Sequence, residues 1–174
     1  MRALPALTRH ERHFDADDVI VSKTDLKGKI TYANQTFIQL SGYSEQELLG
    51  APHNLIRHPD MPRCVFKLLW DTIAAGNEIF AYVVNRSRNG DHYWVFAHVT
   101  PSYDLNGKLV GYHSNRRVPK RQPIDSVIIP TYKALVDVEN QNPDPRAGME
   151  ASLGVVVNML QEKGMTYDQW VLSL

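Results

Sequence analysis

Hydrophobic and polar positions alternate with the period of strands at the start of the chain and with the period of helices after it. The alternation over residues 19–33 predicts a two-stranded hairpin that turns at residues 25–28. Asn34 and Ser44 then stand where helix N-caps are expected, each before a short helix that a glycine ends. Residues 51–62 hold three prolines, which predicts a loop or single helical turns.

A longer helix and a three-stranded meander follow this loop. An apolar stripe at helical spacing predicts a helix over residues 62–76, opened by a proline and ended by a glycine. Residues 79–87, 92–102 and 109–118 have the composition of three long strands. The Asn-Gly pair between the first two is a strong hairpin signal, so the meander is expected to be antiparallel.

The composition changes after the third strand, where helical patterns return. Residues 124–138 form an amphipathic pattern, in which Pro130 is expected to kink the helix or end its first turn. A second helix is predicted over residues 149–163, and Thr166 is a candidate cap for a last short one. We therefore divide the chain into three parts: an N-terminal segment (1–16), a sheet domain (17–118) and a helical C-terminal extension (119–174).

Composition and charge exclude several classes of protein. The 174 residues include 19 basic and 19 acidic ones, so no basic field favours nucleic acid or an anionic membrane. One cysteine, Cys64, excludes a disulfide scaffold and a cysteine-built metal site. No apolar stretch reaches the length of a membrane span, and the first residues lack a signal-peptide core. We expect a soluble, cytoplasmic protein without membrane insertion. It is not expected to be an enzyme, since no nucleophile–base or acid–base pair stands out.

Four sequence blocks and the order of the elements carry a family resemblance. The blocks are residues 30–34 (Ile-Thr-Tyr-Ala-Asn), 41–43 (Ser-Gly-Tyr), 52–62 and 89–95. Over about residues 17–118 the chain resembles PAS domains. Through the block from Arg57 to Pro62 it resembles most the FAD-binding PAS domain of bacterial aerotaxis receptors.

The resemblance implies an α+β PAS fold, in which a five-stranded antiparallel sheet carries small helices on one face and encloses a ligand pocket. A C-terminal helical tail would follow. It also implies non-covalently bound FAD whose redox state, reporting redox or oxygen status, is passed on to a signalling protein partner. The receptors have a tryptophan where this chain has Ile79. A haem-binding gas sensor and a cofactor-free interaction or dimerisation module therefore stay open as alternatives.

Two polar residues on the predicted strands are candidate contacts to a flavin ring. Asn85 shares a strand face with apolar residues, and its amide can both donate to and accept from the ring edge. Flavin-binding PAS domains carry an asparagine at the matching place. His113 is expected on the inward face, where light-sensing PAS domains hold a glutamine near the flavin. A solvated sheet histidine and a haem ligand are the other readings of His113.

The proline-framed loop holds further candidates for cofactor binding. Arg57 is suited to pair with a pyrophosphate, while His58 and Asp60 can contact ribose or adenine groups. The resemblance assigns this block to FAD binding, although Arg57 and Asp60 could instead pair with each other and clamp the loop. Additional candidates are Asn34, His53 and Asn54, of which the first is equally well explained as a helix cap.

One aromatic group is predicted on the outside of the sheet. Trp94, Phe96 and His98 share the face opposite the one that would line the pocket. An exposed aromatic patch needs a cover. Either the terminal helices of the same chain or a second subunit could supply it, the latter giving a homodimer.

Overall fold

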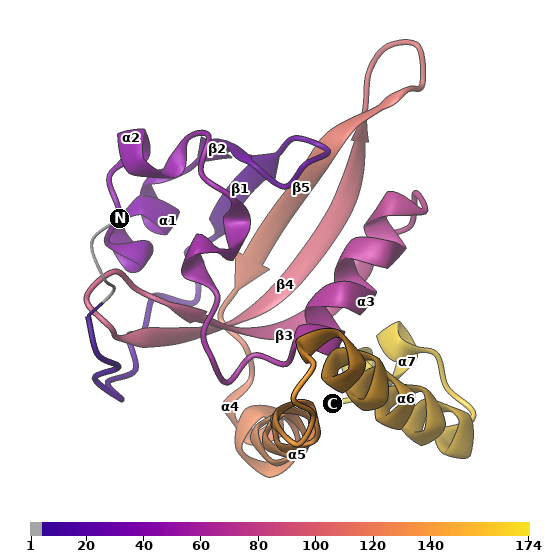
Figure 1. The fold of residues 1–174 in the computed structure, drawn as a ribbon. Coiled ribbons are helices and arrows are strands. Elements are labelled where there is room, and N and C mark those ends of the chain that lie inside the picture. The colour runs from indigo at the N-terminus through magenta and orange to yellow at the C-terminus, as the bar shows by residue number, and fades with distance from the viewer. Residues whose placement is uncertain (1–4) are drawn as a thin grey trace.

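A five-stranded antiparallel sheet organises this computed structural model, which describes residues 5–174, and its strand order is β2-β1-β5-β4-β3 (Figure 1). The strands are β1 (Ile20–Thr24), β2 (Ile30–Ala33), β3 (Ile79–Arg86), β4 (His92–Tyr103) and β5 (Leu109–Arg117). All neighbours in the sheet pair antiparallel. The five-stranded sheet expected from the sequence is thus confirmed.

Four short or medium helices connect β2 to β3. They are α1 (Gln35–Ser41), α2 (Glu45–Leu48), the 3-10 turn η1 (His53–Ile56) and α3 (Arg63–Ala74). The Asn34 side chain accepts a hydrogen bond from the Phe37 amide and so caps α1, as its position predicted. Ser44 and Glu47 form a capping box at the start of α2.

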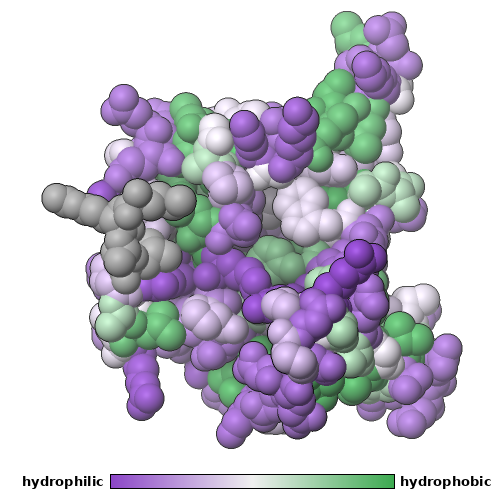
Figure 2. Space-filling view, in the orientation of Figure 1, coloured by the Kyte–Doolittle hydropathy of each residue, from purple (hydrophilic) through white to green (hydrophobic). Residues whose placement is uncertain are grey.

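Part of the core lies between one face of the sheet and these helices, and the rest includes buried residues of the C-terminal helices such as Leu135 and Trp170. Val65, Leu69 and Ile73 of α3 are buried at the helical spacing that the sequence showed. In Figure 1, α3 runs beside β4, and it packs on β3 and β4. On the face seen in Figure 2, hydrophobic residues form small patches separated by hydrophilic ones.

The C-terminal extension is helical, as predicted, and begins with an unbroken helical run. The elements are α4 (Arg121–Pro123), the π-helical turn η2 (Ile124–Ile128), α5 (Ile129–Asn140), α6 (Pro145–Lys163) and α7 (Tyr167–Leu172). Pro130 lies in the first turn of α5, directly after the π turn, so the expected interruption is a change of helix type and not an end of the helical run. The wide π turn immediately before it removes the clash that a proline ring makes with the preceding turn of a regular α-helix.

This extension packs along the edge strand β3 and covers part of the outer sheet face. The Tyr132 hydroxyl of α5 donates to the Tyr82 carbonyl at 2.6 Å, and the Phe80 amide of β3 donates to Asp168 of α7 at 2.9 Å. An unpaired strand edge is a liability in a folded protein, and these contacts close part of it.

The outer aromatic group receives its cover from the same chain. The Tyr132 ring lies 6.2 Å from the Trp94 ring, centroid to centroid, and Trp94 is only 7% exposed. Phe96 is half-buried and packs against Phe80 and Tyr82 of the neighbouring strand. A homodimer through this face stays a prediction, now limited to the part that α5 leaves open.

A buried carboxylate joins the extension to α3. The Oε1 atom of Glu139 accepts hydrogen bonds from the Cys64 amide at 3.0 Å and from the Ser152 hydroxyl at 3.0 Å. The N-cap residue of α3 is Pro62, which provides no side-chain cap. Glu139 of α5 therefore takes the place of a capping side chain for α3.

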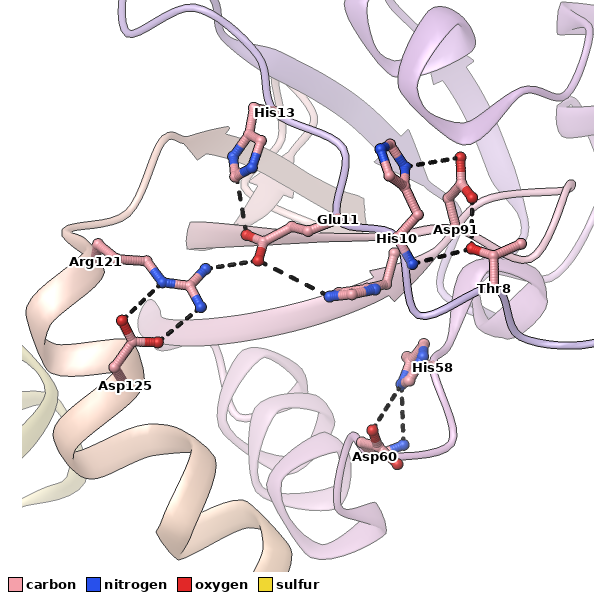
Figure 3. Close-up of polar contacts among 10 residues, drawn as sticks. Thr8, His10, Glu11, His13, His58, Asp60, Asp91, Arg121 and Asp125 are labelled. Atoms are coloured by element: carbon pink, nitrogen blue, oxygen red, sulfur yellow. Dashed lines mark hydrogen bonds and ion pairs between the residues drawn. The ribbon is translucent and has the colours of Figure 1, made fainter.

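The N-terminal segment runs beside the start of β4. The Thr8 amide donates to the Gly90 carbonyl, and Glu11 forms a parallel bridge with His92. Figure 3 shows the Glu11 carboxylate between the side chains of His13 and Arg121, with the Arg121 guanidinium at 2.6 Å. This segment therefore connects the sheet with the beginning of the C-terminal extension.

We expect Glu139→Ala to lower the free energy of unfolding by about 1–3 kcal/mol, because the buried Cys64 amide loses its acceptor. Glu139→Gln keeps an oxygen acceptor and should lose less. The control is Glu150→Ala, which removes an exposed ion pair with Arg146 and should change stability by about 0.5 kcal/mol or less. Urea unfolding measures all three variants. Equal effects of Glu139→Ala and Glu150→Ala would contradict the capping role.

Candidate functional site

An internal cavity lies between the inner face of the sheet and α3. Its volume is about 50 Å³, and its lining is mostly apolar. The lining residues come from β1, η1, α3 and the last three strands: Ser22, Thr24, His53, Phe66, Leu69, Trp70, Ile73, Val83, Asn85, Ala97, Val99, Tyr112, Ser114 and Arg116. Ligand sites usually combine such apolar walls with a few convergent polar groups.

Several polar groups of the lining have no hydrogen-bond partner in the protein. They are the Asn85 amide nitrogen, the Thr24 hydroxyl, and two nitrogens of Arg116, Nε and Nη1. Asn85 and Arg116 are each only 2% exposed. Buried donors without partners are rare in folded proteins because each one costs about 1–3 kcal/mol. Most of these free groups are donors, so the cavity is suited to a ligand that presents acceptor atoms.

Arg116 is the most unusual member of this set. Its Nη2 atom donates to the Ser22 hydroxyl, and its guanidinium lies over the Phe37 ring, 4.6 Å from the ring centroid. Burial lowers the pKa of Arg116 to about 10, which still leaves it positively charged at neutral pH. A buried positive charge thus borders the cavity.

His53 is the second titratable group of the cavity. Its ring stacks on Phe37, and its Nε2 atom lies 3.3 Å from the Ser22 hydroxyl, which also contacts Arg116. Burial, and to a smaller degree the charge of Arg116, lower the pKa of His53 to about 3. His53 is therefore neutral at physiological pH.

Aromatic side chains close one side of the cavity. The rings of Trp70 and Tyr112 meet edge to face, with centroids 5.6 Å apart. Gly28, in the β1–β2 turn with a φ of 74°, lies above Trp70, and a Cβ there would stand 3.1 Å from the indole. Small-molecule sites are commonly about 300–1,000 Å³ in volume. A multi-ring ligand therefore requires the side chains that line the cavity to move apart.

The structure corrects the expectation for His113. The β5 residues that line the cavity are Tyr112, Ser114 and Arg116, so His113 lies on the opposite face of the sheet. There it pairs with Thr100 and with Lys23 of the neighbouring strands. Arg116, and not His113, is the polar β5 residue with free donors at the cavity.

Within the proline-framed loop, His53 lines the cavity, whereas the residues after it line a separate surface groove. Asn54, Arg57, His58 and Asp60 line a surface groove of about 480 Å³, together with Arg63 at the start of α3. The Arg57 guanidinium lies 5.7 Å from the centroid of the Phe66 ring. Because Phe66 lines the cavity, this contact links a residue of the groove with a residue of the cavity.

Within this loop the alternative of an Arg57–Asp60 clamp is wrong. Arg57 donates to the Met61 carbonyl at 3.0 Å, whereas Asp60 lies beside His58, 3.6 Å from its Nδ1 atom (Figure 3). The Nε atom of Arg57 is buried without a partner. Arg57 thus keeps one free donor beside the groove.

The side chain of Asn34 is used within the protein and not at the cavity. Both ends of the Asn34 side chain are used within the protein, since it accepts from the Val21 and Phe37 amides and donates to the Val19 carbonyl. It does not line the cavity. His113, the histidine considered as a haem ligand, does not line the cavity.

Sequence reasoning missed Arg116, and it included Trp70 only as part of the apolar stripe over residues 62–76. Register across the β4–β5 hairpin identifies Arg116, because it pairs with Ala97 and paired residues share a face. Ile79, which replaces a tryptophan of the receptors, is buried in β3 but does not line the cavity. Trp70 of α3 supplies an aromatic wall instead.

No group of three metal-ligating side chains gathers within residues 5–174. Burial raises the pKa of the Cys64 thiol to about 11, so this thiol is protonated at neutral pH. None of the helices in this part of the chain combines the length and apolarity that a bilayer crossing requires.

A five-stranded antiparallel sheet in this order, with buried polar groups at a cavity beneath the connecting helix α3, is typical of an α+β domain of the PAS type. A family model described as "PAS fold" matches residues 30–116, half of the chain. The protein belongs to the PAS family.

Curated relatives carry the same region. The chain is 44% identical to the aerotaxis receptor of Escherichia coli K12 over 135 residues, which cover 78% of this chain and 26% of the receptor. It is 31% identical to the nitrogen fixation regulatory protein of Klebsiella pneumoniae over 99 residues, covering 57% of this chain and 20% of that protein. The chain thus spans about a quarter or less of the length of these relatives.

Solved structures share the fold. The dark structure of the blue-light photoreceptor Aureochrome1 LOV matches with a TM-score of 0.55 and 24% identity, over 63% of this chain and 81% of that one. A PAS domain from Colwellia psychrerythraea matches with a TM-score of 0.50 and 24% identity, over 58% of this chain and 86% of that one.

The pKa of His53 predicts a dependence of stability on pH. Its folded pKa of about 3 lies below the unfolded value of about 6.5, so the unfolded chain binds one more proton between these values. The free energy of unfolding therefore falls as the pH drops below 6.5, by up to about 2 kcal/mol from this residue at pH 5.

His53→Gln should remove that part of the pH dependence, measured by urea unfolding at pH 7.5 and pH 5. His13→Gln, in which an exposed histidine of the N-terminal segment is replaced, is the control and should keep the wild-type dependence. The same loss of stability at pH 5 in wild type and His53→Gln would show that His53 is not held neutral.

Proposed function

We propose that this PAS domain binds FAD non-covalently and reports redox or oxygen status to a signalling protein partner. The observation that carries the proposal is the set of unpaired donors on Asn85 and Arg116 at an otherwise apolar cavity. An isoalloxazine ring is flat and apolar over most of its area, with carbonyl and nitrogen acceptors along one edge. The donors and the aromatic walls are suited to these two properties.

Distinct residues would hold the two parts of the cofactor. Asn85 and Arg116 would donate to the acceptor edge of the ring, while Trp70 and Phe66 would pack on its apolar surface. When bound, the ring supplies reversible electron uptake, which no side chain of the cavity offers. The protein's part is to position the ring and to exclude water from it.

The groove beside the cavity supports FAD over a shorter flavin. Arg57 and Arg63 bring two positive charges to it, beside the carboxyl groups of Asp60 and Glu139, and both guanidinium groups can pair with phosphate oxygens. Arg57 of the groove contacts Phe66 of the cavity, so a ligand that reached from one to the other would span a ring site and a site with two arginines. This arrangement agrees with the FAD-binding role that the resemblance gives to the 57–62 block.

The contacts of α3 supply a route for the signal. α3 forms one wall of the cavity, and its first turn is hydrogen-bonded to Glu139 of the C-terminal extension. A ligand that displaces α3 must therefore disturb α5 and α6, where a signalling partner can detect the change. We infer a cytoplasmic, non-enzymatic sensor. The names of the relatives, an aerotaxis receptor and a nitrogen fixation regulator, are consistent with such a role.

The direct test is to purify the chain, release any bound molecule by mild denaturation and determine its mass. We expect a yellow protein that releases FAD and loses its visible absorption on reduction. A Soret band would identify haem instead. A colourless protein that also fails to bind added FAD would favour a cofactor-free interaction module and would refute the proposal.

Asn85→Leu should weaken FAD binding by about one to two orders of magnitude, because a buried hydrogen bond worth about 1–3 kcal/mol is lost. Asn115→Leu is the matched control, since Asn115 lies on the other face of the sheet, paired with His98. Fluorescence titration measures both dissociation constants. Equal affinities of the two variants would exclude Asn85 as a ring contact.

Arg57→Ala separates the two parts of the ligand. It should weaken FAD binding about tenfold or more, because a charge-assisted pair with the phosphates is lost, and should leave the affinity for riboflavin nearly unchanged. Asn85→Leu should weaken the binding of both ligands. If Arg57→Ala weakens riboflavin as strongly as FAD, Arg57 acts by supporting Phe66 and not by binding phosphate.

A further inference from the structure

Arg116 brings a positive charge to the cavity without a matching negative charge. It is the only cavity-lining residue that is charged at neutral pH, since His53 is neutral and the rest of the lining has no carboxylate or amine. No carboxylate among residues 5–174 pairs with it. Its one polar partner is the neutral Ser22 hydroxyl.

A neutral ligand does not require a positive charge in its binding site. Carbonyl and ring-nitrogen acceptors are satisfied by neutral donors such as the Asn85 amide. Buried charges in proteins are normally paired with an opposite charge, because an unpaired one is strongly unfavourable. The free Nε and Nη1 atoms of Arg116 therefore match a ligand that is negatively charged at this place.

We propose that Arg116 makes the cavity bind the reduced, negatively charged flavin ring more tightly than the oxidised, neutral ring. The inference rests on the proposed flavin function and adds the residue that sets the redox preference of the site. The net charge of the ring is −1 when it has taken up one electron and no proton, or two electrons and one proton. Arg116 stabilises either form by Coulomb attraction and two N–H groups.

The surroundings of Arg116 offer the ring no ready proton that would remove this charge. His53 is a neutral imidazole and not an acid at neutral pH, since its pKa is about 3, and the pKa of the nearby buried Tyr93 is raised by burial to about 12. The remaining polar neighbours are hydroxyl and amide groups, which do not ionise at neutral pH. The negative charge therefore stays beside the guanidinium.

The redox preference has a thermodynamic measure. By linkage, the ratio of the dissociation constants of the reduced and oxidised flavin equals the change that the protein causes in the flavin's redox equilibrium. A residue that binds both forms equally leaves that ratio unchanged. Arg116 is expected to change it, whereas Asn85, a neutral donor, is expected to affect both forms more evenly.

The experiment compares wild type, Arg116→Gln and Arg116→Lys, with Arg117→Gln as the control. Arg117 is the exposed neighbour on the other sheet face, so Arg117→Gln removes the same charge outside the cavity. FAD affinity is measured by titration, and the redox equilibrium by stepwise reduction with dithionite in the presence of a reference dye. The stability of each protein without ligand is measured by urea unfolding.

We expect Arg116→Gln to weaken binding of the reduced form about 10- to 100-fold more than binding of the oxidised form. Arg116→Lys, which keeps the charge, should shift the ratio less, and Arg117→Gln should not shift it. Without ligand, Arg116→Gln should be at least as stable as wild type, because an unpaired buried charge is gone. A ratio equal in wild type and Arg116→Gln would overturn the inference and leave flavin binding intact.

The remaining outcomes are also decisive. If wild type binds no flavin in either state, both the proposed function and this inference fail. If Arg116→Gln does not fold, the absorption spectrum of reduced wild type decides. The spectrum of the negatively charged ring, unchanged from pH 8 down to pH 5.5, supports Arg116 as its counter-charge. Conversion to the spectrum of the protonated ring within that range overturns the inference.

Discussion

The hydrogen bond from the Cys64 amide to Glu139 is the buried contact that joins α3, one wall of the cavity, to the C-terminal extension. α3 begins after a proline and has no capping side chain of its own, so its first turn requires an acceptor from elsewhere. The extension provides that acceptor from a buried position, held by Ser152. As a result, α3 cannot shift away from α5 without leaving the Cys64 amide or the Glu139 carboxylate without its partner.

Local signals in the sequence were sufficient for most of the architecture. Asn34, Ser44 and Thr166 mark helix starts because their side chains accept from amides that the helix leaves free. The Asn-Gly pair before β4 marks a hairpin because its glycine adopts a positive φ, 96° at Gly90. Each of these signals acts within a few residues, so a single sequence contains all the information needed.

The faces of β5 could not be predicted in the same way, because they depend on an irregularity between two strands. The β4–β5 register shifts between Ser102 and Tyr103, so that Val99 pairs with Ser114. Without that extra residue Val99 would pair with His113, and the histidine would face the cavity. A one-residue slip exchanges the two faces of a strand. For the same reason the alternation alone could not assign Arg116, which general tendencies of charged residues would place outside.

The π-helical turn before α5 holds one more residue per turn than an α-helix, and this has a consequence for how the extension tolerates change. Deleting one residue between Ile124 and Ile128 would replace the π turn by an α-helical turn that closes with one residue fewer, so the residues after it would keep nearly the same side-chain directions. A deletion inside α5 between Tyr132 and Glu139 would not be absorbed in this way. Each α-helical residue advances the side-chain direction by about 100°, so Glu139 would turn away from α3 while Tyr132 stayed on β3. The π turn therefore holds its extra residue without changing which faces of α5 meet β3 and α3.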